Sequence, residues 1–300
     1  MRTIFVDCTP ELRHVITARH LPVPDDVRIH VGSPTQDALA ALLSEAEIAL
    51  VEHSVIPPAV IDRCPNLKGI VFMGTGAGTY IDLEDAARRN LPVLTTPGYG
   101  DQAVAEHALA LLLSAARGIA AMDRAIRAGL WRPTGGLQLQ GRKVAVLGLG
   151  GIGTAFADMA TALGMRVAAW NRTPRAHPAF VPDLDEALRD ADVVSLHLGL
   201  NAGTAGLLDA RRLGLPRAGF ILVNTARAAL VDEAAMRDAL ASGRMGHAAL
   251  DVFPQEPLPA GSPYATLENA TLTAHAAYMT EAAYEELWHR TLRACETLAR

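Results

Sequence analysis

The chain has 300 residues, of which 50% are hydrophobic and 20% charged, and its formal net charge is -5. This length is comfortable for two domains, and the composition is ordinary for a globular protein. A mildly acidic chain offers no electrostatic case for binding nucleic acid or an anionic membrane. The three cysteines are an odd and sparse set, which argues against a disulfide framework, and none has metal-ligand spacing. Because no signal peptide or membrane-spanning run is evident, we expect a cytoplasmic protein.

Short apolar strands alternate with amphipathic helices over the first hundred residues. Repeated β-α-β alternation predicts a parallel sheet with helices on both faces. Strands are expected at residues 3–6, 27–31, 48–52, 68–73 and 93–95, and helices at 11–18, 37–46, 58–63 and 82–89.

A proline- and glycine-rich break at residues 95–102 ends this first series. A long apolar helix over residues 103–119 follows it, and a second alternating series begins at Lys143. A last helix, 281–299, could return to the first unit. The second series comprises strands at 143–147, 166–170, 192–197, 219–224, 247–250 and 270–273, and helices at 152–163 and 232–241.

The second series opens with a glycine turn of the type that binds dinucleotides. The segment KVAVLGLGGIG places an apolar strand before Gly148, Gly150, Gly151, Ile152 and Gly153, and a helix follows. The first glycine permits a tight turn, the second lets the backbone approach a pyrophosphate, and the last lets helix and strand pack closely. The helix N-terminus then offers free N–H groups to phosphate. The alternative is a plain glycine-rich turn of an α/β protein.

The next strand ends in WNRTPR, where an NAD-binding chain would usually carry an acidic residue. Asn171 lies 18 residues after Gly153, close to the expected position of the ribose-binding acid. An aspartate at this position would repel a 2′-phosphate, and Asn171 removes that repulsion. Arg172, Thr173 and Arg175 add hydrogen-bond donors for such a phosphate. This favours NADP(H) over NAD(H). The alternative is that Asn171 binds an NAD ribose while the arginines face water.

Four polar residues follow predicted strands near the end of the chain. Arg227, Asp251, Glu256 and His275 would all lie beyond carboxyl ends of strands, where open α/β sheets bind ligands. A guanidinium can bind a carboxylate through two parallel hydrogen bonds, and a histidine beside a carboxylate can give and take a proton. Taken singly, each could be a surface arginine, a turn carboxylate or a buried histidine.

In this setting the chain resembles the D-isomer-specific 2-hydroxyacid dehydrogenases, a family that includes glyoxylate/hydroxypyruvate reductases. The similarity covers most of the chain and keeps the family's motif order. The resemblance implies a flavodoxin-like substrate domain at residues 1–98 plus 282–300, and a Rossmann cofactor domain at 99–281. It is carried by GTGAGTYIDLEDAA, AVAEHALALLLSAAR, GLGGIG, NTARAALVDEAAM, ALDVFPQEPL and LTAHAAYMTEAA.

The resemblance also implies a role for each candidate side chain. Arg227 matches the substrate-binding arginine, Glu256 the carboxylate of the catalytic pair, and His275 the acid/base. Asp251 matches the aspartate that holds the nicotinamide amide. The remaining cofactor-binding residues implied are His197, Thr225 and Ala226, and the backbone that would hold the substrate carboxylate is that of Thr75, Gly76 and Ala77.

The reaction implied is hydride transfer from nicotinamide C4 to the keto carbon of a small 2-oxo acid, such as glyoxylate or hydroxypyruvate, with His275 as the proton donor. Glu256 argues against the formate-oxidising branch, which carries glutamine there. A phosphite dehydrogenase-like oxidoreductase and a dinucleotide-sensing corepressor-like protein of the same fold remain alternatives.

The resemblance further implies a homodimer formed through the apolar helix at residues 103–117. A helix buried within one chain is the alternative. Trp131, on the segment that follows, could reach the partner's site, although ordinary packing is the simpler interpretation. His107 on the same helix is expected to pack the helix and not to take part in catalysis.

Overall fold

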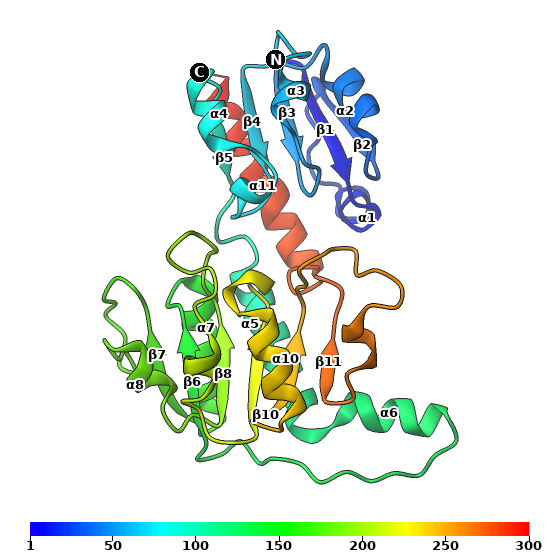
Figure 1. The fold of residues 1–300 in the computed structure, drawn as a ribbon. Helices are drawn as coiled ribbons and strands as arrows, with labels where there is room; N and C mark the ends of the chain where they lie inside the picture. Colours follow the sequence, from blue (N-terminus) through cyan, green and yellow to red (C-terminus); the bar gives the residue numbers. More distant parts are fainter. Residues whose placement is uncertain (300) are drawn as a thin grey trace. The chain divides into compact units, whose positions relative to one another are not determined.

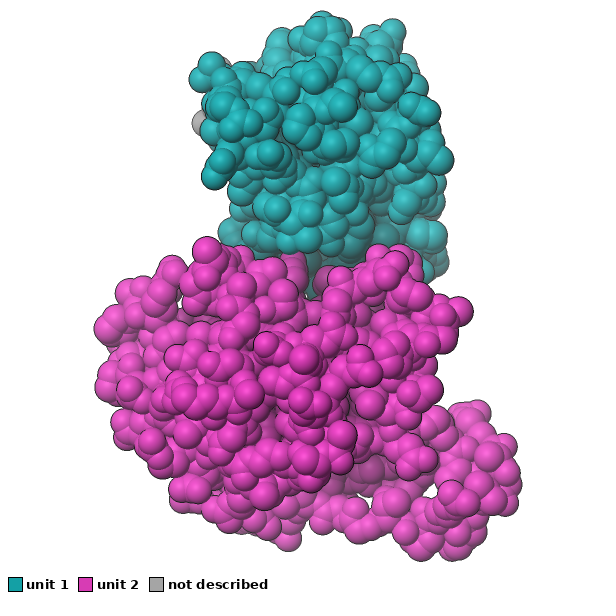
Figure 2. All heavy atoms as spheres, in the orientation of Figure 1, with its two compact units in different colours: residues 1–100, 278–300 teal, residues 101–277 magenta. Residues whose placement is uncertain are grey.

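The computed structural model describes residues 1–299 and divides the chain into two compact units, coloured separately in Figure 2. Unit 1 contains Met1–Gly100 and the segment from Tyr278 onward, and unit 2 contains Asp101–Ala277. Each unit is built on one sheet, of five strands in unit 1 and six in unit 2. All strand pairs in both sheets are parallel. The predicted α/β class with two parallel-sheet domains is therefore confirmed.

The unit 1 sheet has the strand order β2-β1-β3-β4-β5, so the chain reverses its direction of winding between β1 and β3 (Figure 1). That order is the flavodoxin-like one, and it places a topological switch point at the carboxyl ends of β1 and β3. Its elements are β1 (Thr3–Cys8), α1 (Pro10–Ala18), β2 (Val27–Val31), α2 (Gln36–Leu43), β3 (Ile48–Val51), α3 (Pro58–Ile61), β4 (Gly69–Phe72), η1 (Ala77–Thr79), α4 (Leu83–Arg88), β5 (Val93–Thr95) and α11 (Glu281–Leu298).

The last helix, α11, packs into unit 1 although most of the chain separates it from that unit in sequence. Its Trp288 is completely buried and stacks on Phe5 of β1, with ring centroids 6.3 Å apart. The indole N–H of Trp288 donates a hydrogen bond of 2.7 Å to the carbonyl of Pro22. Burial of an aromatic pair of this size stabilises unit 1 by several kcal/mol, on the order of 3–5 for loss of the tryptophan ring.

The unit 2 sheet has the strand order β11-β10-β9-β8-β6-β7, with its switch point between β6 and β8. An isolated bridge between Ala169 and Phe180 extends the β7 edge. Its elements are α5 (Asp101–Arg117), α6 (Ile119–Arg127), β6 (Lys143–Leu147), α7 (Gly151–Ala162), β7 (Arg166–Trp170), α8 (Leu184–Leu188), β8 (Val193–Leu196), α9 (Ala210–Leu213), β9 (Phe220–Asn224), η2 (Ala228–Leu230), α10 (Glu233–Ala241), β10 (Met245–Leu250), η3 (Pro263–Thr266) and β11 (Ala270–Leu272).

Apolar clusters cover both faces of the unit 2 sheet. Leu147, Leu196 and Leu222 belong to one cluster, while Val146 and Ile221 belong to the other. A parallel sheet covered on both faces needs strands that are apolar along their whole length. This explains the uninterrupted runs VAVL and ILV in the sequence.

The long helix predicted over residues 103–119 is wrong at its end. It stops at Arg117 because Gly118 takes a left-handed conformation (φ 61°), and α6 begins at Ile119. α6 has no buried residue within the chain and extends away from the sheet of its unit (Figure 1). Ile119, Ile126 and Trp131 are 52%, 54% and 86% exposed, so this segment presents apolar side chains to its surroundings.

Over residues 1–299, no single helix is long and apolar enough to cross a membrane. α5 and α6, which meet at an angle of 66°, reach the length and apolar composition of a membrane span only when they are counted together.

Candidate active site

The glycine turn between β6 and α7 is packed too tightly for side chains at two of its positions. Gly148 has φ 107°, and a Cβ there would collide with the carbonyl oxygen of His197. A Cβ at Gly153 would collide with the carbonyl oxygen of Gly148. Both positions therefore require glycine for close approach of the helix to the strand ends.

Of the other two glycines, only Gly150 borders open space at the N-terminus of α7. A Cβ at Gly150 would meet no atom within 4 Å, while the space beside Gly151 is taken by the Asp101 carboxylate. Within the described chain, the N–H groups of Gly150, Gly151, Ile152 and Gly153 make no hydrogen bond. An open position at Gly150, backed by these unpaired N–H groups, is what a pyrophosphate needs in order to bind.

After β7, the side chain of Asn171 is hydrogen-bonded within the protein, whereas those of Arg172 and Arg175 are not. Asn171 Oδ1 accepts a hydrogen bond from the N–H of Leu149 (3.1 Å), and its Nδ2 donates one to the carbonyl of Thr173 (2.7 Å). Arg172 and Arg175 are exposed, and among residues 1–299 neither side chain has a hydrogen bond or ion pair. Both guanidinium groups are thus available to an anion.

Two buried polar atoms at the carboxyl ends of β8 and β9 lack partners in the described part of the chain: Nδ1 of His197 and the hydroxyl of Thr225. His197 Nε2 bonds the Ser195 hydroxyl (2.8 Å), and its ring packs 4.9 Å from that of Phe156. Burial lowers the pKa of His197 to about 3, so its imidazole is neutral. An uncharged ring this deeply packed suits a wall of the site and not proton transfer. Two unpaired polar atoms at neighbouring strand ends also suit a polar ligand such as a dinucleotide.

Glu256 and His275 form a direct pair. His275 Nδ1 lies 2.6 Å from Glu256 Oε2, while Glu256 Oε1 accepts the N–H of Phe253 at 2.8 Å. Burial alone would raise the pKa of Glu256, but the hydrogen bonds from His275 and Phe253 and the charge of Arg227 lower it below its ordinary value. Glu256 is therefore an anion that fixes the histidine ring through Nδ1.

The loop that carries His275 is held by Asp251 at the end of β10. Asp251 is completely buried; Oδ1 accepts from the Thr273 hydroxyl (2.6 Å) and the Ala276 N–H (2.9 Å), and Oδ2 accepts from the Ala277 N–H (3.0 Å). Burial opposes its charge, yet these bonds and His107 keep the pKa of Asp251 below the ordinary value. His275 takes a left-handed conformation (φ 50°) in this loop. The nicotinamide contact expected of Asp251 stays a prediction beside these contacts.

Arg227 is presented by a turn that Asn224 builds at the end of β9. The Asn224 side chain accepts the N–H of Ala226 (3.0 Å) and donates to the carbonyl of Arg227 (2.9 Å). The Arg227 guanidinium is half-buried and donates to the carbonyl of Ala226 at 2.7 Å. Arg227, Glu256 and His275 follow β9, β10 and β11, which are neighbouring parallel strands, so all three lie beyond the same edge of the sheet. The charge of Arg227 also lowers the pKa of Glu256.

In unit 1, the loop after β4 contains the residues expected to hold the substrate carboxylate. In the part of the chain that the structure describes, the N–H groups of Thr75, Gly76 and Ala77 make no hydrogen bond. At the end of β3 of the same unit, Glu52 is 3% exposed and accepts the Tyr278 hydroxyl at 3.0 Å. Burial raises the pKa of Glu52 to about 8.

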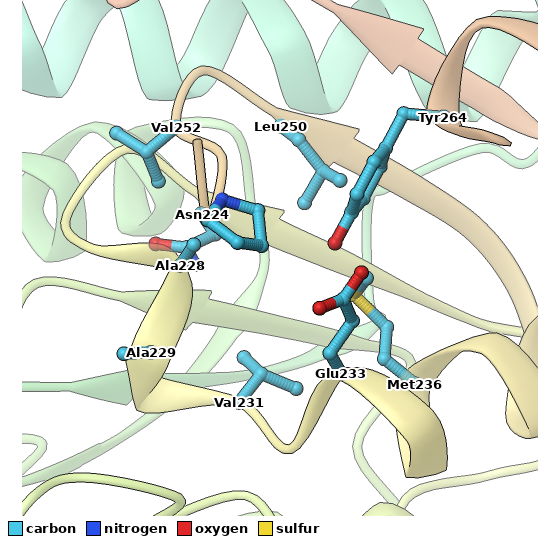
Figure 3. A pocket seen from close by; sticks show the side chains of 10 residues that line it. Asn224, Ala228, Ala229, Val231, Glu233, Met236, Leu250, Val252 and Tyr264 are labelled. Atoms are coloured by element: carbon cyan, nitrogen blue, oxygen red, sulfur yellow. The ribbon is translucent and has the colours of Figure 1, made fainter. Parts of the chain in front are cut away.

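A separate pocket of about 230 Å³ lies beside β9, β10 and α10. Its walls are mostly apolar, and the Tyr264 hydroxyl and the Glu233 carboxylate point toward one another across it (Figure 3). Arg227, Glu256 and His275 are not among its lining residues. Within residues 1–299, no group of three His, Cys, Asp or Glu side chains could hold a metal ion.

Sequence reasoning missed two parts of this arrangement. His107 does more than pack its helix, because its Nε2 bonds the Thr273 hydroxyl at 3.0 Å and lies 3.6 Å from Asp251 Oδ1. No local pattern could have joined residues this far apart in the chain. The role of Asn224 could have been predicted, because an asparagine at a strand end often forms a hydrogen bond with the backbone two residues further along the chain.

The two parallel sheets, the glycine turn and the Arg-Glu-His group together define a two-domain α/β protein of the dinucleotide-binding dehydrogenase type. Residues 109–277 match the family model of the D-isomer specific 2-hydroxyacid dehydrogenase, NAD binding domain. The chain belongs to the D-isomer specific 2-hydroxyacid dehydrogenase family, as its sequence predicted.

Named relatives extend this comparison. D-3-Phosphoglycerate dehydrogenase of Mycobacterium tuberculosis (strain ATCC 25618 / H37Rv) is 37% identical over 262 residues, which is 84% of this chain and 49% of the relative. The chain thus spans about half the length of that protein. The crystal structure of the TT0316 protein from Thermus thermophilus is 37% identical, with a TM-score of 0.83 over 96% of this chain and 93% of that one. The acyclic imino acid reductase Bsp5, solved with NADPH and D-Arg, is 27% identical, with a TM-score of 0.85 over 99% and 96%.

Proposed function

We propose that the chain is an NAD(P)-dependent oxidoreductase that reduces a small 2-oxo acid, such as glyoxylate or hydroxypyruvate, to the D-2-hydroxy acid. The single observation that carries this proposal is the 2.6 Å contact between His275 and Glu256 beside Arg227. Family membership supports it, because an acid/base pair next to a guanidinium suits a substrate that carries both a carboxylate and a keto group.

The chain's own residues have separate tasks in this reaction. Arg227 binds the substrate carboxylate. His275 donates a proton from Nε2 to the keto oxygen as it becomes an alkoxide, and Glu256 holds the ring through Nδ1. The nicotinamide, when bound, supplies the hydride that goes to the keto carbon. Unit 1 is then the substrate domain, and unit 2 is the dinucleotide domain.

The proposed cofactor is NADP(H) in preference to NAD(H). The pyrophosphate would lie on the N–H groups of Gly150, Gly151 and Ile152, beside the open face of Gly150. Arg172 and Arg175 carry unpaired positive charge directly after β7, where the adenosine ribose of a dinucleotide is expected. NADPH in the Bsp5 structure supports this choice by analogy.

The proposed assembly is a homodimer, with its interface on α5, as the resemblance implies, and on α6. α5 buries Ala105, Leu111 and Leu112 within its own unit and leaves Leu113 38% exposed. Further exposed apolar side chains lie on α6 and the segment after it, at Ile126 and Trp131. A second copy of the chain is the partner that such a surface would fit.

The deciding experiment is a matrix of kcat/KM values for glyoxylate, hydroxypyruvate and pyruvate, each with NADH and with NADPH. An arm with ammonia added tests for imine reduction, the kind of reaction after which Bsp5 is named. We expect turnover with at least one 2-oxo acid, and its loss in His275→Asn. Tight dinucleotide binding without turnover on any substrate would contradict the reductase and favour a binding module.

A further inference from the structure

The Asn171 side chain joins two loops that a dinucleotide must touch. Its Oδ1 accepts the N–H of Leu149, inside the glycine turn, and its Nδ2 donates to the carbonyl of Thr173, in the turn after β7. A carboxamide has one accepting and one donating end. The side chain is therefore engaged within the protein at both ends, each in the role that its chemistry allows.

These two bonds fix the parts that would contact the cofactor. Leu149 is buried (4% exposed), and its N–H is used by Asn171, so it is not offered to phosphate. The backbone N–H of Gly148 is also held, by the carbonyl of Trp170 at 2.7 Å. The turn is thereby pinned at 148 and 149, while the N–H groups of the next residues stay open. We call the two hydrogen bonds of the Asn171 side chain the clamp; it also fixes the start of the segment that carries Arg172.

An aspartate at position 171 would have the same size as the asparagine, but it could not make both hydrogen bonds. One carboxylate oxygen could still accept from Leu149. The other would face the Thr173 carbonyl oxygen, which stands 2.7 Å from the present Nδ2. Two acceptors at that distance repel one another, and neither has a proton to share. The turn at residues 171–173 would have to open.

We propose that Asn171 is a positioning residue that holds the glycine turn and the turn after β7 in register, so that it supports both cofactors equally and leaves the choice between them to Arg172 and Thr173. This inference rests on the proposed dinucleotide binding. It replaces the interpretation of Asn171 as a reader of the ribose, in which an aspartate would favour NADH.

The test compares Asn171→Asp, Asn171→Ala and Arg172→Ala in the full chain. Dissociation constants for NADH and NADPH are measured by titration of intrinsic fluorescence, and kcat at saturating cofactor is measured for each variant. We expect Asn171→Asp to weaken both cofactors by a similar factor, about 10-fold or more, with kcat nearly unchanged. Asn171→Ala introduces no repulsion and should therefore reduce the affinity for both cofactors by a smaller factor. Arg172→Ala should reduce the affinity for NADPH alone.

A titration with pH adds a readout specific to the clamp. A protonated aspartate can donate to the Thr173 carbonyl, so Asn171→Asp should recover affinity for both cofactors as pH falls toward about 4–5, relative to the wild type. Tighter NADH binding with weaker NADPH binding in Asn171→Asp would overturn the inference, as would unchanged binding of both. A wild type that binds neither dinucleotide would overturn the proposed function as well.

Discussion

His275 Nδ1 lies 2.6 Å from Glu256 Oε2, so the carboxylate holds the imidazole ring through Nδ1. Glu256→Gln keeps a side-chain oxygen for the hydrogen bond but removes the negative charge that stabilises a protonated imidazole. We expect kcat for 2-oxo acid reduction to fall by about 10-fold or more. Steady-state rates between about pH 5.5 and 9 measure this.

The pKa of the Glu256 carboxylate sets the pH range over which the pair with His275 is intact. The pKa of Glu256 is below its ordinary value, so the pair stays intact in mild acid and is lost only as pH falls through that lowered pKa. Glu268→Gln, an exposed change, is the control. A Glu256→Gln profile that overlays the wild-type profile would show that the charge is not used.

Arg172 should govern the choice of cofactor. Its guanidinium is exposed and unpaired within the described residues, so Arg172→Ala removes the proposed phosphate ligand without disturbing the fold. We expect kcat/KM with NADPH to fall by about 10-fold, with little change for NADH. Arg237→Ala, an exposed arginine on α10, serves as the control. Equal losses with both cofactors would remove the 2′-phosphate contact from consideration.

Gly150 and Gly153 should behave differently when changed to alanine. Gly153→Ala forces a Cβ into the carbonyl of Gly148, so it should lower the stability of unit 2 by roughly 2–4 kcal/mol. Gly150→Ala meets no atom within 4 Å, so the melting temperature should hold while cofactor affinity drops. Calorimetry and cofactor titration separate the two effects. Cofactor binding that survives Gly150→Ala would mean that the pyrophosphate does not lie against this residue.

Glu52 predicts a dependence of stability on pH. Its folded pKa of about 8 lies above its ordinary 4.5, so between these values the folded chain holds a proton that the unfolded chain has lost. Its contribution to stability is thus largest in acid and declines as pH rises toward about 8, by on the order of 3–5 kcal/mol in all. Glu52→Gln is neutral throughout and can still bond Tyr278. Thermal midpoints at about pH 5 and about pH 8.5 should therefore differ less in this variant than in the wild type.

Ile126 tests the proposed dimer. It is 54% exposed on a helix with no buried residue in its own chain, so Ile126→Glu should not affect folding. We expect light scattering after gel filtration to show a dimer for the wild type and a monomer for the variant, because a buried charge without a partner is costly. Trp131→Ala with unchanged KM and kcat would exclude a catalytic role for that arm. A monomeric wild type would refute the interface.

The sequence by itself determined the class of fold and the identity of the candidate residues, because both depend on local patterns. Apolar runs such as VAVL and ILV recur with helical segments between them, and this pattern specifies parallel strands covered on both faces. The glycine turn at Gly148–Gly153 is local too. The predicted end of α5 is wrong because Gly118 turns left-handed within an otherwise helical pattern, and a single glycine does not always end a helix.

Only the tertiary structure decided what the polar side chains contact. The family resemblance makes Asp251 a candidate ligand of the cofactor, and spacing makes Asn171 one. The structure adds that both use their oxygens to hold loops within the protein. The bond between His107 and Thr273 joins residues 166 apart, and Glu52 contacts Tyr278 across 226 positions. Such pairings depend on which strand ends are brought together in space, and no periodicity along the chain carries that information.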